Sequence, residues 1–289
     1  MTDVAVASPV SEARAARRER LQLLLRSPSF LIGSVVIGFW VVCAILGDRI
    51  TPYHPLFDQT PDLSVSPSSE HWFGTDRLGR DVFSRVLAGS RDILLVAPLA
   101  TVLATVFGTA LGLITGYFRG IADDTISRVI DAVLAIPLIV LAVTVVASLG
   151  SRSTWSVTVV IAIVFAPIIA RTVRAAVLGE AQLDYVEAAR LRGERSPYVM
   201  FVEVLPNVMP PILVEATIRL GYAIFAVATL TFIGFGLQPP SPDWAVQIAD
   251  NFQFLSDQWW TVLFPALAIA SLVVAVNLIS DSVQQVLER

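Results

Sequence analysis

The sequence contains no lysine, and all 20 of its basic residues are arginine. This absence excludes chemistry that needs a lysine amine, such as the phosphate-binding lysine of a P-loop, a Schiff base or a lysine general base. We therefore expect any lysine-dependent chemistry linked to this chain to reside in a partner.

Cysteine and histidine are also scarce. The single cysteine, Cys43, lies in an apolar stretch and has no second cysteine for an intrachain disulfide. His54 and His71 are 17 positions apart in a proline-rich stretch, without the close spacing of metal ligands. We expect a structural or solvated role for both histidines, and neither a metal nor another cofactor in this chain.

Charged residues make up only 15% of the chain and hydrophobic residues 55%, whereas soluble domains average about 25% and 45–50%. The formal net charge of −4 offers none of the clustered cations that nucleic-acid binding requires. This composition excludes an ordinary soluble domain, argues against a nucleic-acid partner, and favours a membrane protein.

Six apolar segments are long enough to cross a bilayer, whose core is about 30 Å thick and needs about 20 residues of helix. The first follows an arginine-rich tail but no signal-peptide cleavage site follows it, so we interpret it as a retained helix. The sixth carries Glu215 and Arg219 near its start. We expect an all-α polytopic membrane protein with six transmembrane helices, at residues 27–47, 93–118, 132–151, 153–170, 208–236 and 258–280.

The distribution of arginine predicts the orientation of these spans. With the N-terminus inside, 13 arginines fall in cytoplasmic segments and six in outer loops, and Arg219 lies within a span. Positive residues near helix ends tend to stay cytoplasmic, and tryptophans prefer the interface. Trp155, Trp259 and Trp260 would enter the membrane at the outer face. We therefore expect both termini in the cytoplasm.

Two segments outside the spans have the pattern of amphipathic helices lying on the membrane surface, Val10 to Arg26 and Leu78 to Arg91. In the second, Asp81 and Arg85 are spaced to pair at i,i+4. The expected organisation is a cytoplasmic segment (1–28), a first span (29–47), an extracytoplasmic loop (48–91) and a five-helix core (92–289).

The loop between the fourth and fifth spans, residues 180–207, has the signals of two short helices. Asp184 and Glu187 resemble a capping box at a helix start, and Gly193 supplies a stop. Ser196 before Pro197 predicts the start of a second helix, and Pro206 predicts the end of that helix. By themselves these signals also fit a structured loop that merely joins two spans.

The spacing of residues in this loop is more specific. Glu187-Ala188-Ala189, three residues, Gly193, and then Leu205-Pro206 is similar to the EAA motif of ATP-binding-cassette import permeases, E-A-A-x₃-G-x₉-I-x-L-P. Every position matches except the isoleucine, where this chain has Glu203.

Other segments extend the resemblance over roughly residues 20–289. The outer-loop run from His71 to Arg85, the residues after Leu205-Pro206, and the run from Phe232 to Pro240 resemble the C-type permease subunit of dipeptide, oligopeptide and nickel importers. Many relatives carry an acidic residue in the fifth span where this chain has Val227.

The resemblance implies a type I importer permease of the bacterial inner membrane. Such a chain forms half of the pathway in a heterodimer with a related permease, and two partner subunits bind ATP and magnesium. An extracytoplasmic binding protein delivers the solute, which is expected to be a peptide, with nickel or another small solute as the alternative. The resemblance assigns coupling to Glu187, Ala188, Ala189 and Gly193; Leu205 and Pro206 complete the motif, and Asp184 is added from the capping pattern.

Two other classes of protein fit less well. An ion-coupled secondary carrier would show ionisable groups near the midplane, but beyond Glu215 and Arg219 only Asp131 and Asp281 approach the membrane. An intramembrane enzyme would need a nucleophile with a base or a metal cluster, and the expected spans contain no histidine and no aspartate pair. We therefore predict a non-catalytic transport subunit.

Glu215 and Arg219 are four residues apart, with the acid first, which lets a helix pair them on one face. Two roles remain open for this pair. It either neutralises two charges within the membrane or contributes to the solute pathway.

Overall fold

The computed structural model describes residue 19 and residues 22–57, 61–150 and 153–287, and most of the predicted amphipathic segment Val10–Arg26 lies outside these ranges. Five helices of the described part are long and apolar enough to cross a membrane, and a bent pair of shorter helices makes six if it counts as one span. The five are α2 (Pro28–Leu46), α3 (Val82–Tyr117), α6 (Thr154–Glu180), α10 (Met209–Phe232) and α12 (Trp260–Leu287).

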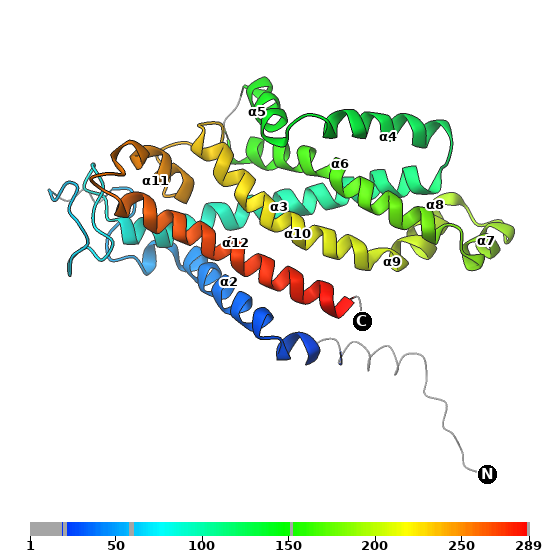
Figure 1. The fold of residues 1–289 in the computed structure, drawn as a ribbon, viewed down its shortest axis with the longest axis horizontal. Coiled ribbons are helices and arrows are strands. Elements are labelled where there is room, and N and C mark those ends of the chain that lie inside the picture. The colour runs from blue at the N-terminus through cyan, green and yellow to red at the C-terminus, as the bar shows by residue number, and fades with distance from the viewer. Residues whose placement is uncertain (1–18, 20–21, 58–60, 151–152, 288–289) are drawn as a thin grey trace, which may run out of the picture.

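Short helices connect the long ones. They lie mainly at the two ends of the bundle, as Figure 1 shows, with α7, α8 and α9 at one end and α11 at the other. The start of α2 and the end of α12 point toward the end that holds α7. The connecting elements are η1 (Gly47–Arg49), α7 (Asp184–Leu191), α8 (Ser196–Tyr198), the π-helical η2 (Val199–Val204), α9 (Leu205–Asn207), α11 (Trp244–Asn251) and η3 (Phe252–Phe254).

Among the helices that the structure describes, α3 and α6 share the most extensive contact. Three glycines of α3, four residues apart, lie on one face of the helix, and a Cβ atom added to any of them would come within 2.6–2.7 Å of a Cβ atom of α6. Small residues at this spacing let two membrane helices approach closely and gain dispersion contacts that lipid cannot supply. The three pairs are Gly108 with Ile169, Gly112 with Val173, and Gly116 with Val177.

The first span is an integral part of this bundle. The indole Nε1 of Trp40 in α2 donates to the Ser271 hydroxyl of α12 at 2.9 Å. A Cβ atom on Gly33 would lie 2.6 Å from the Ala275 carbonyl oxygen, so the two helix backbones are nearly in contact there. The bundle therefore holds α2 along its length.

The helix expected at Leu78–Arg91 does not exist as a separate surface element. Instead α3 begins at Val82, where the Asp81 carboxylate accepts from the Ser84 amide at 2.8 Å, and continues for 36 residues, about 54 Å. The expected Asp81–Arg85 pair is also wrong, because Asp81 contacts His71 at 2.9 Å and Arg85 lies beside Asp76 instead.

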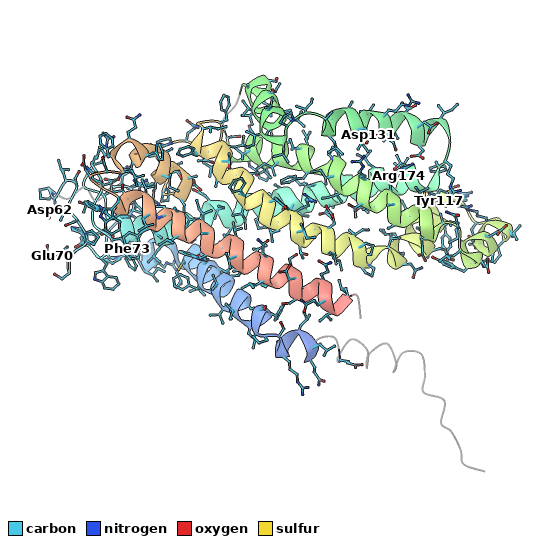
Figure 2. All side chains as sticks on the ribbon, viewed as in Figure 1. Asp62, Glu70, Phe73, Tyr117, Asp131 and Arg174 are labelled. Carbon is cyan, nitrogen blue, oxygen red and sulfur yellow. The ribbon has the colours of Figure 1, made fainter. Side chains whose placement is uncertain are left out.

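The loop before α3 is anchored by buried charge. Arg85 is only 1% exposed; its guanidinium lies 3.6 Å from Asp76 and donates to the Ser241 carbonyl at 3.1 Å. Asp76 also binds Arg80 at 2.7 Å. Figure 2 shows Phe73 at this end of the molecule, and its ring stacks on Phe264 of α12 at 3.8 Å. These contacts hold the loop against α3 and α12.

The third expected span, 132–151, is not one straight helix. Helix α4 (Ile121–Leu134) starts earlier and meets α5 (Leu138–Leu149) at a 97° bend. The break falls at Pro137, whose ring removes a backbone donor and disfavours a helical residue before it. Two side-chain pairs hold α4 against α6, the bidentate pair of Arg174 with Asp123 at 2.6 and 2.7 Å and the pair of Arg171 with Asp131 at 3.0 Å (Figure 2).

The glycine contact predicts opposite outcomes for one substitution at two sites. Alanine normally stabilises a helix relative to glycine by about 1 kcal/mol. Nothing lies within 4 Å of a Cβ atom on Gly38, so Gly38→Ala is expected to leave the melting temperature in detergent unchanged or higher. Gly112→Ala places a methyl group 2.6 Å from the Cβ atom of Val173, and overpacking of this kind costs about 1–3 kcal/mol. Equal melting temperatures for the two variants would contradict this account.

Candidate functional site

The loop between α6 and α10 forms two short helical segments, as the sequence predicts, but its first helix starts differently. Helix α7 begins at Asp184, its N-cap is Leu183, and no side chain caps it. The capping box expected from Asp184 and Glu187 is therefore wrong, because the chain turns into the helix one residue earlier and the Leu183 carbonyl accepts from the Val186 amide. Both acids remain in the first turn, where negative charge complements the helix dipole.

The end of α7 is the one predicted. Gly193 has a φ of +80°, a conformation that glycine adopts without the usual steric cost. Its amide donates to the Arg190 carbonyl at 3.0 Å, and the Glu194 amide donates to the Ala189 carbonyl at 3.3 Å. These two bonds are a Schellman motif, which ends the helix and turns the chain sharply.

The second segment differs from the prediction at both ends. Arg195, not Ser196, is the N-cap, and no side chain bonds the free amides. Pro206 does not end the segment: α8, η2 and α9 follow one another from Ser196 to Asn207, and Pro206 lies in the first turn of α9. A missing amide proton costs little in a first turn, so the proline is accommodated.

The EAA residues divide between a buried and an exposed face of α7. Val186 and Ala189 are fully buried and pack in the same cluster as buried residues of η2. Glu187 and Ala188 are exposed, and Leu191 is 83% exposed. Leu205 is half-buried and Pro206 exposed. Helix α7 thus presents a small, partly apolar surface outward.

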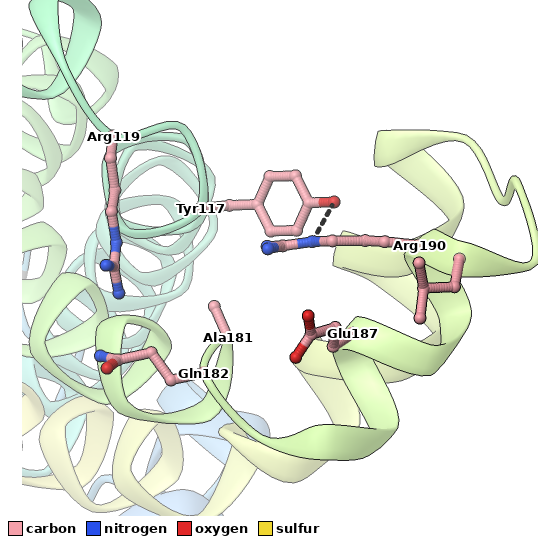
Figure 3. Close-up of a pocket in the computed structure, with 7 residues that line it drawn as sticks. Tyr117, Arg119, Ala181, Gln182, Glu187 and Arg190 are labelled. Carbon is pink, nitrogen blue, oxygen red and sulfur yellow. Dashed lines mark hydrogen bonds between the residues drawn. The ribbon is translucent and has the colours of Figure 1, made fainter.

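An open pocket of about 680 Å³ lies between α7 and the ends of α3 and α6. The guanidinium of Arg190 lies 4.7 Å from the centroid of the Tyr117 ring, and its Nε donates to the Tyr117 hydroxyl at 3.4 Å. Figure 3 shows the Glu187 carboxylate facing the pocket from α7, with Arg119 on the opposite side. The lining residues are Tyr117, Arg119, Ala181, Gln182, Glu187, Arg190 and Leu191.

The Tyr185 hydroxyl on the first turn of α7 bonds residues at both ends of the loop. It donates to the Glu180 carboxylate at 2.5 Å and accepts from the Asn207 side-chain amide at 2.9 Å. Burial and the bond to Glu180 raise the pKa of Tyr185 to about 12. The hydroxyl therefore keeps its proton near neutral pH. The capping and EAA patterns do not single out Tyr185, because its partners are known only from the fold.

Glu215 and Arg219 form the intrahelical pair that their spacing allows. The Arg219 Nε lies 2.5 Å from a Glu215 carboxylate oxygen in α10, and the guanidinium also lies 5.2 Å from the Tyr222 ring. Both side chains are largely buried. Nearby, Asn277 and Asp281 of α12 line a groove of about 450 Å³ between α10 and α12. Whether the pair serves stability or solute passage remains a prediction.

Substitution of Gly193 tests the conformation of the turn. Nothing lies within 4 Å of an added Cβ atom, so any effect comes from the backbone rather than from crowding. A left-handed residue costs most side chains about 1–2 kcal/mol, and asparagine less. We expect Gly193→Val to speed amide hydrogen exchange of residues 184–194 roughly tenfold, and Gly193→Asn to change it little. Equal protection in the two variants would show that the left-handed turn is not needed.

The ion pair predicts a pattern of membrane abundance. An unpaired charge costs about 2.5–3.5 kcal/mol at a helix centre and less toward the interface. Glu215→Ala and Arg219→Ala are each expected to lower abundance more than the exchange of the two residues, which keeps the pair. Abundance is measured by immunoblotting of membranes. Normal accumulation of both single variants would oppose the structural role and favour the pathway role.

Comparison with known proteins places these features in a family. Residues 108–289 match the binding-protein-dependent transport system inner membrane components. The chain is 38% identical over 271 residues to the dipeptide transport system permease protein DppC of Alkalihalophilus pseudofirmus, covering 94% of this chain and 89% of that protein. It is 40% identical over 270 residues to DppC of Escherichia coli K12, covering 91% and 89%.

A solved structure has a similar fold. A chain of the MetNI methionine ABC transporter, determined in inward-facing conformations, superimposes with a TM-score of 0.58 and 20% identity, covering 71% of this chain and 97% of that one. This chain therefore belongs to the family of binding-protein-dependent transport system inner membrane components and has the fold of a type I ABC importer permease.

Proposed function

We propose that this chain is the permease subunit of an ATP-driven peptide importer, and that it couples to its ATPase through the loop from Glu180 to Asn207. It forms half of the translocation pathway with a related permease. A binding protein delivers the peptide from outside, and two partner subunits bind ATP and magnesium. The single observation that carries this proposal is the EAA spacing from Glu187 to Pro206, which begins on the exposed face of α7 at one end of the bundle.

The surface of α7 supports a docking role. Leu191 is 83% exposed at the end of α7, in a loop outside the five long apolar helices, which leaves an apolar side chain available for contact with a partner. Ala188 beside it has no bulk, so a partner can approach the helix closely. Glu187 adds a carboxylate that faces the pocket beside α7 (Figure 3). A partner with an apolar groove and a cationic group fits this surface.

Two observations support a cytoplasmic position for this loop and for both termini. The start of α2 and the end of α12 point toward the end of the bundle that holds α7 (Figure 1). The arginine bias of the sequence assigns that end to the cytoplasm. ATP is available there, whereas this chain lacks the lysine of a phosphate-binding loop. Hydrolysis therefore belongs to the partner.

The peptide substrate rests on the relatives, which are dipeptide permeases similar along most of the chain. Nickel or another small solute remains the alternative within this family. An ion-coupled carrier is disfavoured because the two charges of α10 already neutralise each other as a pair.

The test combines purification with uptake. A tagged chain purified from its host is expected to bring down a second permease and an ATP-binding subunit. Ala188→Trp on the exposed face of α7 should lower recovery of the ATP-binding subunit about tenfold, an effect within the range of interface hot spots. The matched control is Ala175→Trp, which alters an exposed alanine of α6 outside the loop.

Uptake identifies the solute. Deletion of the gene is expected to abolish entry of a labelled dipeptide and to leave entry of ⁶³Ni²⁺ unchanged. Loss of nickel entry alone would overturn the peptide assignment. Recovery of no ATP-binding subunit with the wild-type chain, or hydrolysis of ATP by the pure chain, would overturn the coupling assignment.

A further inference from the structure

Three parts of the chain meet at one hydroxyl group. Tyr185 lies on α7, Glu180 is the last residue of α6, and Asn207 is the last residue of α9, two positions before α10 begins. The Tyr185 hydroxyl donates to Glu180 and accepts from Asn207 at 2.9 Å. The same Asn207 amide nitrogen also donates to the Glu203 carbonyl at 2.8 Å, which fixes its orientation.

A helix as short as α7 does not hold its own position. It has eight residues, and helices of this length are unstable in water without tertiary contacts. Its inner face is apolar and packs on η2, which belongs to the same loop. Apolar packing excludes water but is not directional, so by itself it lets α7 slide on η2. Hydrogen bonds to the flanking spans are directional and fix the position of α7.

Among the described residues of α7, side-chain hydrogen bonds come from Tyr185 and Arg190 alone. Arg190 reaches α3 through a long contact of 3.4 Å to Tyr117. Tyr185 reaches both ends of the loop at shorter distances and with its side chain half-buried. The shortest polar connections from α7 to α6 and to the start of α10 therefore pass through this one side chain.

The chemistry of the phenol suits this position. Its hydroxyl is both a donor and an acceptor, so one group satisfies a carboxylate on one side and an amide on the other. Phenylalanine would keep the ring and lose both bonds. Histidine and tryptophan would change the shape of the side chain, and the shorter serine side chain would not reach Glu180 and Asn207.

We propose that Tyr185 is the positioning residue of the coupling loop, through which a displacement of α7 reaches α6 and α10 together. This inference rests on the proposed function of the loop and names the residue that makes the loop act on the spans. Ala188, Glu187 and Leu191 face outward for docking, whereas Tyr185 faces the spans.

The test uses the complete complex in nanodiscs with its binding protein, and dialanine as the transported probe. Tyr185→Phe is compared with Tyr198→Phe, which alters an exposed tyrosine of the same loop. We expect Tyr185→Phe to keep ATP hydrolysis within about twofold and to lower dialanine transported per ATP roughly tenfold, the factor that two hydrogen bonds of ordinary strength allow. Tyr198→Phe should match the wild type in both.

A double-mutant cycle separates positioning from general damage. Asn207→Ala alone should lower the ratio of transport to hydrolysis, and adding it to Tyr185→Phe should lower that ratio little further, because the bond between them is already lost. Glu180→Gln keeps an acceptor for the hydroxyl and is expected to stay close to the wild type. Independent, additive losses from Tyr185→Phe and Asn207→Ala would overturn the proposal.

A distance measurement reports the displacement itself. Spin labels at Arg195→Cys in the loop and Leu213→Cys in α10, in a Cys43→Ala background, are expected to show an ATP-dependent distance change that Tyr185→Phe reduces and Tyr198→Phe preserves. Loss of the ATP-binding subunit from the Tyr185→Phe complex, or behaviour identical to Tyr198→Phe, would overturn the proposal. A wild-type complex that transports no dialanine, or contains no ATPase, would instead overturn the proposed function.

Discussion

The close contact between α3 and α6 is the constraint on which the rest of the structure depends. Three glycines bring these helices so near that no side chain fits between them along two turns. The contact fixes the end of α6, from which α7 departs, and the end of α3, where Tyr117 follows the last glycine of the stripe. Helix α10 packs against both. A membrane offers no hydrophobic force between helices, so such close packing has to supply the cohesion.

Helix α3 also runs from one end of the bundle to the other. Near its start, buried Arg85 is held by Asp76 and by the Ser241 carbonyl, which joins the loop before α3 to the segment before α11. At its last residue, Tyr117 meets Arg190 of α7. The two ends are about 54 Å apart along a single helix. Because this helix packs closely on α6, the loop before α3 and helix α7 contact opposite ends of one tightly packed helix pair.

Much of this arrangement follows from the sequence, and the failures have local causes. The lengths of the apolar segments predict the spans, and Gly193 predicts the end of α7, because both features depend on residues that are near one another in the sequence. The starts of helices are harder to predict from the sequence. Asp81 caps α3 and Asp184 does not cap α7, although each is an aspartate before an apolar pattern. The difference lies in the path of the preceding chain. The hydrogen-bond partners of Tyr185 are 5 and 22 residues away in the sequence, so the local signals that mark helix starts and ends do not identify them. In contrast, the spacing of Gly108, Gly112 and Gly116 is readable in the sequence and indicates a close helix contact.

The loop from Glu180 to Asn207 leads directly into α10, a helix that carries a largely buried ion pair. The Glu215–Arg219 pair lies in the half of α10 that follows α9, and the groove containing Asn277 lies farther along the helix, where Tyr222 and Phe225 line it. A paired charge is neutral toward lipid but still polar toward water, so the depth at which the pair lies in the membrane affects the stability of the helix. A rigid displacement of α10 moves both halves together. The contact between Tyr185 and Asn207, two residues before α10 begins, therefore bears on the position of the ion pair and of the groove at once.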